Sequence, residues 1–215
     1  MYMKRPLVLV AVLWSSIAHA GGAFIGQPGH FDYYVLTLSW EPSYCSQPNA
    51  DPKECGGGDH GFVLHGLWPQ MQAGGYPENC PSKFHLDPAA LAYQQQNQVF
   101  PSEGLLQHEW TTHGVCDGRD ATAYIHAAAQ AHAAIHVPDV LQAGSHPTNI
   151  TADGISQAFR QANPALTNRS VAVHCGGKAL KEVQFCLGKD FQPVSCGNGV
   201  RTACPGGPLI VPSMH

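Results

Sequence analysis

The chain has 215 residues, eight cysteines, thirteen histidines and a formal charge of −4 with histidine neutral. This acidic balance excludes a broad basic face for nucleic acid at neutral pH. Protonation of the histidines below about pH 6.5 would turn the balance positive and strengthen attraction to phosphates, so we expect an acidic working pH.

The first twenty residues have the features of a cleaved secretory signal. A basic start is followed by an apolar run over residues 7–13, and small residues lead up to Ala20. The apolar run is far shorter than the roughly 20 residues that cross a bilayer. We therefore expect a leader over residues 1–20, a secreted or periplasmic mature chain that starts near Gly21, and no membrane anchor.

All eight cysteines lie after the leader. An even set in an exported chain favours disulfides over metal ligands or free thiols, and the Cys-x-x-Cys spacing of zinc ribbons is missing. The remaining length suits one sizeable core. We expect residues 21–215 to form a single domain.

The first predicted elements are two strands separated by a loop. Residues 33–40 alternate in polarity, which predicts a half-buried strand. Residues 41–60 are rich in Pro, Gly, Asp and Cys and predict a loop closed by Cys45 and Cys55. Residues 62–65 predict a short buried strand.

The middle of the chain is predicted to be a long loop followed by helices. Residues 66–85 carry repeated Gly and Pro, which indicate a loop of the kind that holds substrate groups on a rigid frame. Helical composition begins at Pro88, and Ala-rich or periodic runs that end before proline predict helices over 121–136 and 153–163.

Two further strands are predicted near the C-terminus, over residues 170–174 and 182–187, before a Gly/Pro-rich tail from Gly197. Strands on both sides of a helical middle indicate an α+β domain. We expect one disulfide-stapled domain with a central antiparallel sheet flanked by helices.

Two histidine segments carry the chemistry, HGLWPQ at 65–70 and HEWTTHGVC at 108–116. His-Glu followed by His is typical of a metalloprotease helix, but there the histidines lie four residues apart. His108 and His113 are five apart, about 140° around a helix, so the spacing argues against a shared metal and we expect none.

On a helix, one polar face would hold four side chains: His108, Thr112, Glu109 and His113. A solvated surface helix is the plain alternative. Trp110 and Cys116 favour a packed, disulfide-anchored segment instead. Histidines beside a carboxylate suit proton transfer at a phosphodiester, and RNA supplies its own nucleophile, the 2′-OH.

These segments, with FDYYVLTLSWEPSYC at 31–45, resemble the ribonuclease T2 family in order and spacing over nearly the whole mature chain. The resemblance implies an endoribonuclease that cleaves single-stranded RNA without metal or cofactor. The products would be 2′,3′-cyclic phosphates and then 3′-phosphates. We expect no DNA cleavage, no membrane partner and a monomer.

The resemblance also implies residue roles. His113 would be the general base on the 2′-OH and His65 the general acid for the leaving group. His108 would hold the phosphate, and Glu109 would lie against it and orient the charged histidines. The family usually has lysine where this chain has Thr112. A hydroxyl cannot neutralise a phosphorane, so we expect weak activity or dependence on protonated His108.

Five positions match substrate-contacting positions of the family. Trp68 and Tyr76 would stack a nucleobase, and Gln70 would contact its edge. Core packing is the alternative for Trp68. Leu105 stands where many relatives have an aromatic side chain at the second base site, which would weaken stacking there. The fifth of these positions is Thr112.

The family framework implies four disulfides: Cys45–Cys55, Cys80–Cys116, Cys175–Cys204 and Cys186–Cys196. Two other functions stay open. One is a non-catalytic, secreted RNA-binding relative. The other is a metal-binding module using His126, His132 and His136. RNA cleavage that persists in EDTA would exclude the metal module, and absence of cleavage at any pH would favour the RNA-binding relative.

Overall fold

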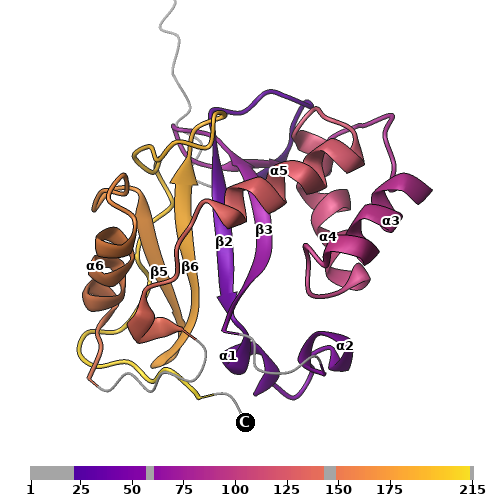
Figure 1. Ribbon diagram of the computed structural model, residues 1–215. Helices are drawn as coiled ribbons and strands as arrows, with labels where there is room; N and C mark the ends of the chain where they lie inside the picture. Colours follow the sequence, from indigo (N-terminus) through magenta and orange to yellow (C-terminus); the bar gives the residue numbers. More distant parts are fainter. Residues whose placement is uncertain (1–21, 57–60, 143–148, 214–215) are drawn as a thin grey trace, which may run out of the picture.

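A computed structural model describes residues 22–56, 61–142 and 149–213, so the expected leader lies outside the described residues. The α+β fold expected from the sequence is confirmed (Figure 1). Its centre is an antiparallel sheet with the strand order β3-β2-β6-β5. The four strands are β2 (Tyr33–Trp40), β3 (Phe62–Gln70), β5 (Val171–Gly176) and β6 (Ala179–Leu187).

All the described α-helices except α1 begin where a side chain satisfies a free backbone amide. Asp51, Asp87, Ser102, Asp120 and Thr151 each accept a hydrogen bond from an amide in the first turn that follows. The helices are α1 (Glu41–Cys45), α2 (Pro52–Cys55), α3 (Pro88–Asn97), α4 (Glu103–Thr112), α5 (Ala121–Ala133) and α6 (Ala152–Ala162). Short 3₁₀ turns cover Gly114–Cys116 and Asp139–Leu141.

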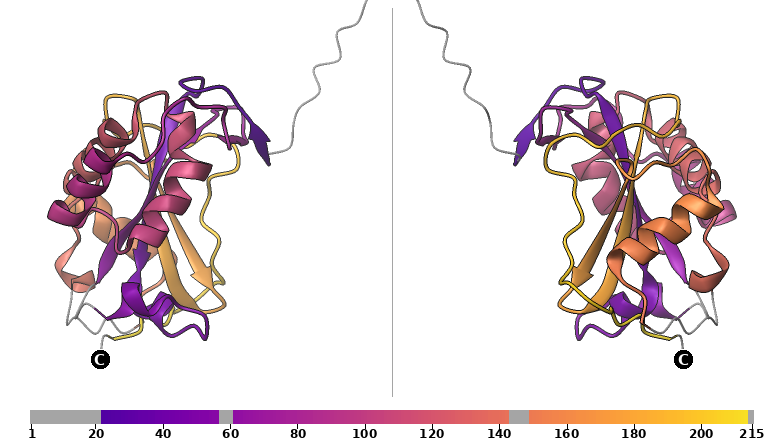
Figure 2. Two further views of the ribbon diagram at one scale, coloured as in Figure 1. Left: turned by 90° about the vertical axis from the view of Figure 1, so that its right-hand side faces the viewer. Right: turned by 90° about the vertical axis from the view of Figure 1, so that its left-hand side faces the viewer.

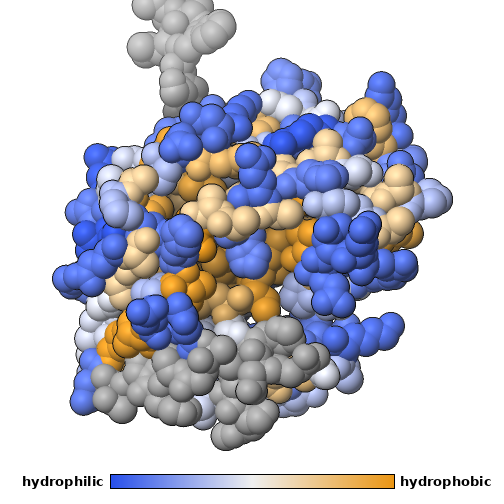
Figure 3. Space-filling model, in the orientation of Figure 1, coloured by the Kyte–Doolittle hydropathy of each residue, from blue (hydrophilic) through white to orange (hydrophobic). Residues whose placement is uncertain are grey.

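The two faces of the sheet differ. One face packs against α4, α5 and α6 through the main core, which includes Leu36, Leu67 and Phe185. The other face carries a smaller cluster around Tyr33 and Val35. The stretch that leads to the C-terminus first runs on that side, where Val194 and Val200 pack, and then returns to the main core at Leu209 (Figure 2). In the space-filling view, hydrophobic residues show in the middle of the helical face, between polar residues at its rim (Figure 3).

The loop predicted over residues 66–85 is wrong in part. Strand β3 continues to Gln70, and β4 (Tyr76–Glu78) pairs in parallel with β1 (Ala23–Ile25). Pro69 is tolerated because β3 is an edge strand, so one side of its backbone needs no ladder partner.

The loop predicted over residues 41–60 is also partly wrong, because α1 and α2 form within it. Proline in the first turn of each helix costs no hydrogen bond. The helix predicted to reach His136 ends at Ala133.

All four disulfides implied by the resemblance are present, with Cα–Cα distances of 5.0–5.6 Å.

Candidate active site

A β-bulge sets the position of His65. Along β2 and β3, Thr37 pairs with Gly66 and Leu38 pairs with Leu64, so His65 is the extra residue. Leu64 and Leu67 lie in the main core. The bulge therefore turns His65 and Gly66 together toward the other face of the sheet.

Helix α4 brings the second segment to this place. Leu106 and Trp110 anchor the helix in the main core. Glu109 is fully buried, whereas His108 is exposed. His113 caps the helix, and its backbone N–H donates to the carbonyl of Glu109. The expected polar face therefore reaches solvent at His108 and the protein interior at Glu109.

Glu109 joins the two segments. The indole Nε1 of Trp68 donates a 2.6 Å hydrogen bond to Glu109 Oε2. Oε1 lies 3.6 Å from His65 Nε2 and has no hydrogen-bond partner among the described residues. A Cβ on Gly66 would lie 2.2 Å from Glu109 Oε2, so glycine is needed for the helix to approach the strand this closely.

His113 lies among aromatic rings. Its ring centroid is 5.2 Å from that of Trp68, 6.1 Å from that of Tyr76 and 6.5 Å from that of His108. Thr112, the last residue of α4, is half-buried. The structure therefore brings His65, His108, Glu109 and His113 together.

Two small cavities flank this cluster. One, of about 260 Å³, is lined by Trp68, Gln70, Tyr76 and His113 among others. The other, of about 250 Å³, is lined by His65 and Leu105 among others. The positions expected to contact two nucleotides thus lie in separate cavities on either side of the histidines.

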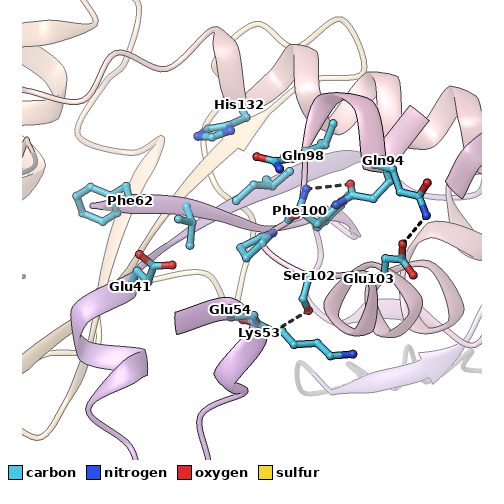
Figure 4. Close-up of a pocket in the computed structure, with 15 residues that line it drawn as sticks. Glu41, Lys53, Glu54, Phe62, Gln94, Gln98, Phe100, Ser102, Glu103 and His132 are labelled. Atoms are coloured by element: carbon cyan, nitrogen blue, oxygen red, sulfur yellow. Dashed lines mark hydrogen bonds between the residues drawn. The ribbon is translucent and has the colours of Figure 1, made fainter. Parts of the chain in front are cut away.

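A third cavity, of about 640 Å³, adjoins the cavity at His65, since Glu41 and Glu54 line both. Figure 4 shows hydrogen bonds between some of its side chains. Ser102 donates to Glu54, and Gln94 bonds the backbone of Phe100 at both ends of its amide. This cavity therefore extends the space beside His65.

Three residues missed by the sequence analysis surround His65. Ser39 Oγ lies 3.3 Å and Glu182 Oε2 lies 3.5 Å from His65 Nδ1. Lys181 Nζ lies 3.9 Å from the same Glu182 oxygen. The alternation of Glu182 and Gln184 with apolar residues was the available signal, because it predicts two polar side chains on one face of a strand.

The electrostatics separate the two candidate proton-transfer groups. Burial, reinforced by His108 and His65, lowers the pKa of His113 to about 3. Burial also disfavours charge on His65, but Glu182 and Glu109 outweigh it and raise the pKa of its imidazole. The surroundings therefore favour the neutral form of His113 and the protonated form of His65.

The carboxyl of Glu109 has a pKa close to neutral pH. Burial raises the pKa of its carboxyl to about 7, against the opposing effects of His65 and the Trp68 hydrogen bond. In acid, the carboxyl is therefore neutral and able to donate a hydrogen bond.

The three histidines considered for a metal-binding module are His126 and His132 of α5 and His136, which lies beyond its end. The ring of His126 stacks on Tyr93 at 3.8 Å, and His132 lines the third cavity. Within the described ranges, no group of three or more His, Cys, Asp or Glu side chains is arranged to hold a metal ion. No helix of these ranges has the length and hydropathy to cross a bilayer.

Comparisons with known proteins agree with the site. A sequence model of the Ribonuclease T2 family matches residues 31–196. A ribonuclease from Aeromonas hydrophila is 34% identical over 206 residues, which cover 91% of this chain and 90% of that protein. Ribonuclease DdI from Dictyostelium discoideum is 27% identical over 81% of this chain and 86% of its own length.

Solved structures share the fold. An RNase-related protein from Calystegia sepium matches with a TM-score of 0.68 at 21% identity, covering 84% of this chain and 97% of that one. Ribonuclease MC1 from bitter gourd seeds matches with a TM-score of 0.66 at 21% identity, covering 84% and 100%. With both histidine segments inside the matched range, the chain belongs to the ribonuclease T2 family of RNA-cleaving enzymes.

Proposed function

We propose that this chain is an endoribonuclease that cleaves single-stranded RNA through 2′-OH attack, with His113 as general base and His65 as general acid. The observation that carries the proposal is the contrast in their surroundings within one cluster: His65 lies between two carboxyl groups, whereas His113 is buried among aromatic rings, and their pKa values move in opposite directions. Environments that push two titratable groups apart in this way suit one to accept and the other to donate a proton.

In the first step, His113 takes the proton of the 2′-OH and the 2′-oxygen forms a bond to phosphorus. The bond from phosphorus to the 5′-oxygen breaks, and the Nε2 proton of His65 passes to that oxygen. The products are a 2′,3′-cyclic phosphate and a free 5′-OH. Each proton transfer contributes roughly 10²- to 10⁴-fold in rate.

In the second step, the roles reverse. His65 takes a proton from water, whose oxygen bonds to phosphorus, and the bond from phosphorus to the 2′-oxygen breaks. His113 returns its proton to the 2′-oxygen. A 3′-phosphate results.

His108 and Glu109 would stabilise the negative charge on the phosphate. The exposed His108 can bind the phosphate when protonated. In acid, the neutral carboxyl of Glu109 can donate through Oε1, which has no other hydrogen-bond partner in the described part of the chain. A neutral donor stabilises the phosphorane without repelling it.

The cavity at Trp68, Gln70 and Tyr76 would hold the base before the scissile bond, and the cavity at Leu105 the base after it. A variant of ribonuclease MC1 has been solved with 5′-UMP, and RNase NT with 5′-AMP. Those complexes support nucleotide binding in this fold. Aromatic rings contribute about 1–3 kcal/mol per stacked base.

The proposal includes export and the extent of the domain. A leader over residues 1–20 would direct the mature domain, residues 21–215, out of the cytoplasm, where its four disulfides persist. We propose a secreted or periplasmic monomer that does not cleave DNA.

The test incubates the purified protein with a single-stranded RNA from pH 4 to 7 in EDTA and identifies the new ends by mass spectrometry. We expect cyclic phosphates that convert slowly to 3′-phosphates, and their loss in His65→Ala and His113→Ala. New ends with a 5′-phosphate, or activity abolished by EDTA, would contradict the mechanism. RNA binding without cleavage at any pH would instead support the non-catalytic relative.

A further inference from the structure

A carboxylate lies behind the proposed general acid, on the side away from the scissile phosphate. In the pairing of β5 with β6, His174 faces Glu182 and Cys175 faces Leu180, so Lys181 is an extra residue at a bulge. Glu182 also lies directly across from Ser39 of β2. On its other side Ser39 pairs with Val63 of β3, so the bulged His65, two positions further along that strand, approaches Ser39 and Glu182 diagonally.

The two nitrogens of His65 have different neighbours. Nδ1 faces Glu182 Oε2 at 3.5 Å and Ser39 Oγ at 3.3 Å, whereas Nε2 faces Glu109 Oε1 at 3.6 Å. Glu182 is only 5% exposed, and Gln184 Nε2 donates to its Oε1 at 3.2 Å. Gln184 thus holds the carboxylate through Oε1, while the buried Oε2, which has no hydrogen-bond partner within the described ranges, faces the imidazole.

We infer that Glu182 is a positioning residue for His65. It accepts the Nδ1–H and so keeps the transferable proton on Nε2, with the ring aimed at the 5′-oxygen of the leaving nucleotide. Histidines that donate one ring N–H to a carboxylate have their tautomer and ring orientation fixed in this way. The inference rests on the proposed role of His65, and Glu182 itself touches no substrate.

Several charged or titratable groups surround His65 and Glu182, and some of them shift the pKa of His65. They are Glu41 of α1, Glu54 of α2, Glu109 of α4, His113 after α4, His174 of β5 and Lys181 of β6. Glu182 and Glu109 raise the pKa of His65, and Lys181 lowers it. Loss of Glu182 and loss of Lys181 should therefore act in opposite directions.

The first experiment compares Glu182→Gln with Lys181→Gln on RNA. We expect Glu182→Gln to lower kcat by roughly 10- to 100-fold, by analogy with carboxylates that orient metal-binding histidines, while KM changes little. In the pH profile of kcat/KM, the alkaline limb of Glu182→Gln should move to lower pH. Lys181→Gln should move that limb slightly upward, because Lys181 is half exposed and solvent screens its charge.

The second experiment separates positioning from a structural role. A nucleoside 3′-(4-nitrophenyl phosphate) releases a leaving group that needs no proton, so a general acid is dispensable. We expect Glu182→Gln to keep its rate on this ester within about twofold while losing cleavage of RNA. Equal losses on both substrates, or an unmoved alkaline limb, would overturn the inference.

Two further variants keep the outcomes distinct. His65→Ala should show the same selective loss on RNA, and if it does not, the proposed role of His65 fails whatever Glu182 does. If Glu182→Gln does not fold, Ser39→Ala removes the other contact to Nδ1. It should reduce kcat on RNA and spare the ester, and equal rates on RNA would count against positioning at Nδ1.

Discussion

At the scale of single residues, the site separates two histidines by their surroundings. His113 is buried beside aromatic rings and other histidines, which disfavour a positive charge. His65 lies between the carboxyl groups of Glu109 and Glu182, which favour a positive charge on its ring. The sequence predicted both residues through their motifs, but it could not predict Glu182, which lies 117 positions from His65 and approaches it only through strand pairing.

This separation predicts the pH dependence of kcat/KM. The active form needs neutral His113 and protonated His65. Since the pKa of His113 is lowered to about 3 and that of His65 is raised, the acid limb should lie well below pH 6.5 and the alkaline limb above it. Initial rates on a short RNA at constant ionic strength measure both limbs. His85→Gln, at an exposed histidine outside the cavities, should leave the profile unchanged, whereas an acid limb above pH 6.5 would refute the assignment.

A second prediction concerns Thr112, where the family usually has lysine. Thr112→Lys places a cation at the half-buried end of α4, next to His113. If this chain lacks a phosphorane-stabilising charge, kcat should rise by up to roughly 10²- to 10³-fold, the scale of one such stabilising group. Rates on RNA from pH 4 to 7 decide the matter. Thr111→Lys, one position earlier on the exposed side, is the control, and equal rates for Thr112→Lys and the unaltered chain would disprove the idea.

At the scale of elements, local signals predicted the strand over 33–40 and the start of α3 well. They were wrong in part over 66–85, because Gly and Pro are ordinarily turn signals. Here Gly66 instead permits the contact of β3 with α4, and Pro69 occupies an edge strand. The meaning of both residues depends on sheet order and helix packing, which a local pattern does not contain.

Gly66→Ala tests the contact between β3 and α4. The new Cβ would meet Glu109 Oε2 and Trp68 Nε1 at 2.2 Å, so Glu109 must move. We expect kcat on RNA to fall by roughly 10-fold or more, through loss of positioning at the phosphate. Gly104→Ala, whose Cβ would meet nothing closer than 3.6 Å, should keep kcat and stabilise α4 by about 0.5–1 kcal/mol. Equal kcat values for the two variants would show that the close approach is dispensable.

At the scale of the whole molecule, one disulfide and the packing of α4 on the core hold the two histidine segments together. The Cys80–Cys116 bridge ties the chain after β4 to the turn after α4, 36 residues apart. The cysteine count predicted a stapled domain, and the resemblance implied the pairing. Neither could predict that Ser39, Glu182 and His65 lie together, because their proximity depends on bulges in two strand pairs.

The central claim, that this chain cleaves RNA by using the 2′-OH of the substrate, is tested most directly on a DNA oligonucleotide with a single ribonucleotide. The product ends are identified by mass spectrometry at acid pH. The account predicts one cut, on the 3′ side of the ribonucleotide, leaving a 2′,3′-cyclic phosphate on it and a 5′-OH on the next nucleotide. Cleavage at deoxynucleotides, or a cut that leaves a 5′-phosphate, would contradict it.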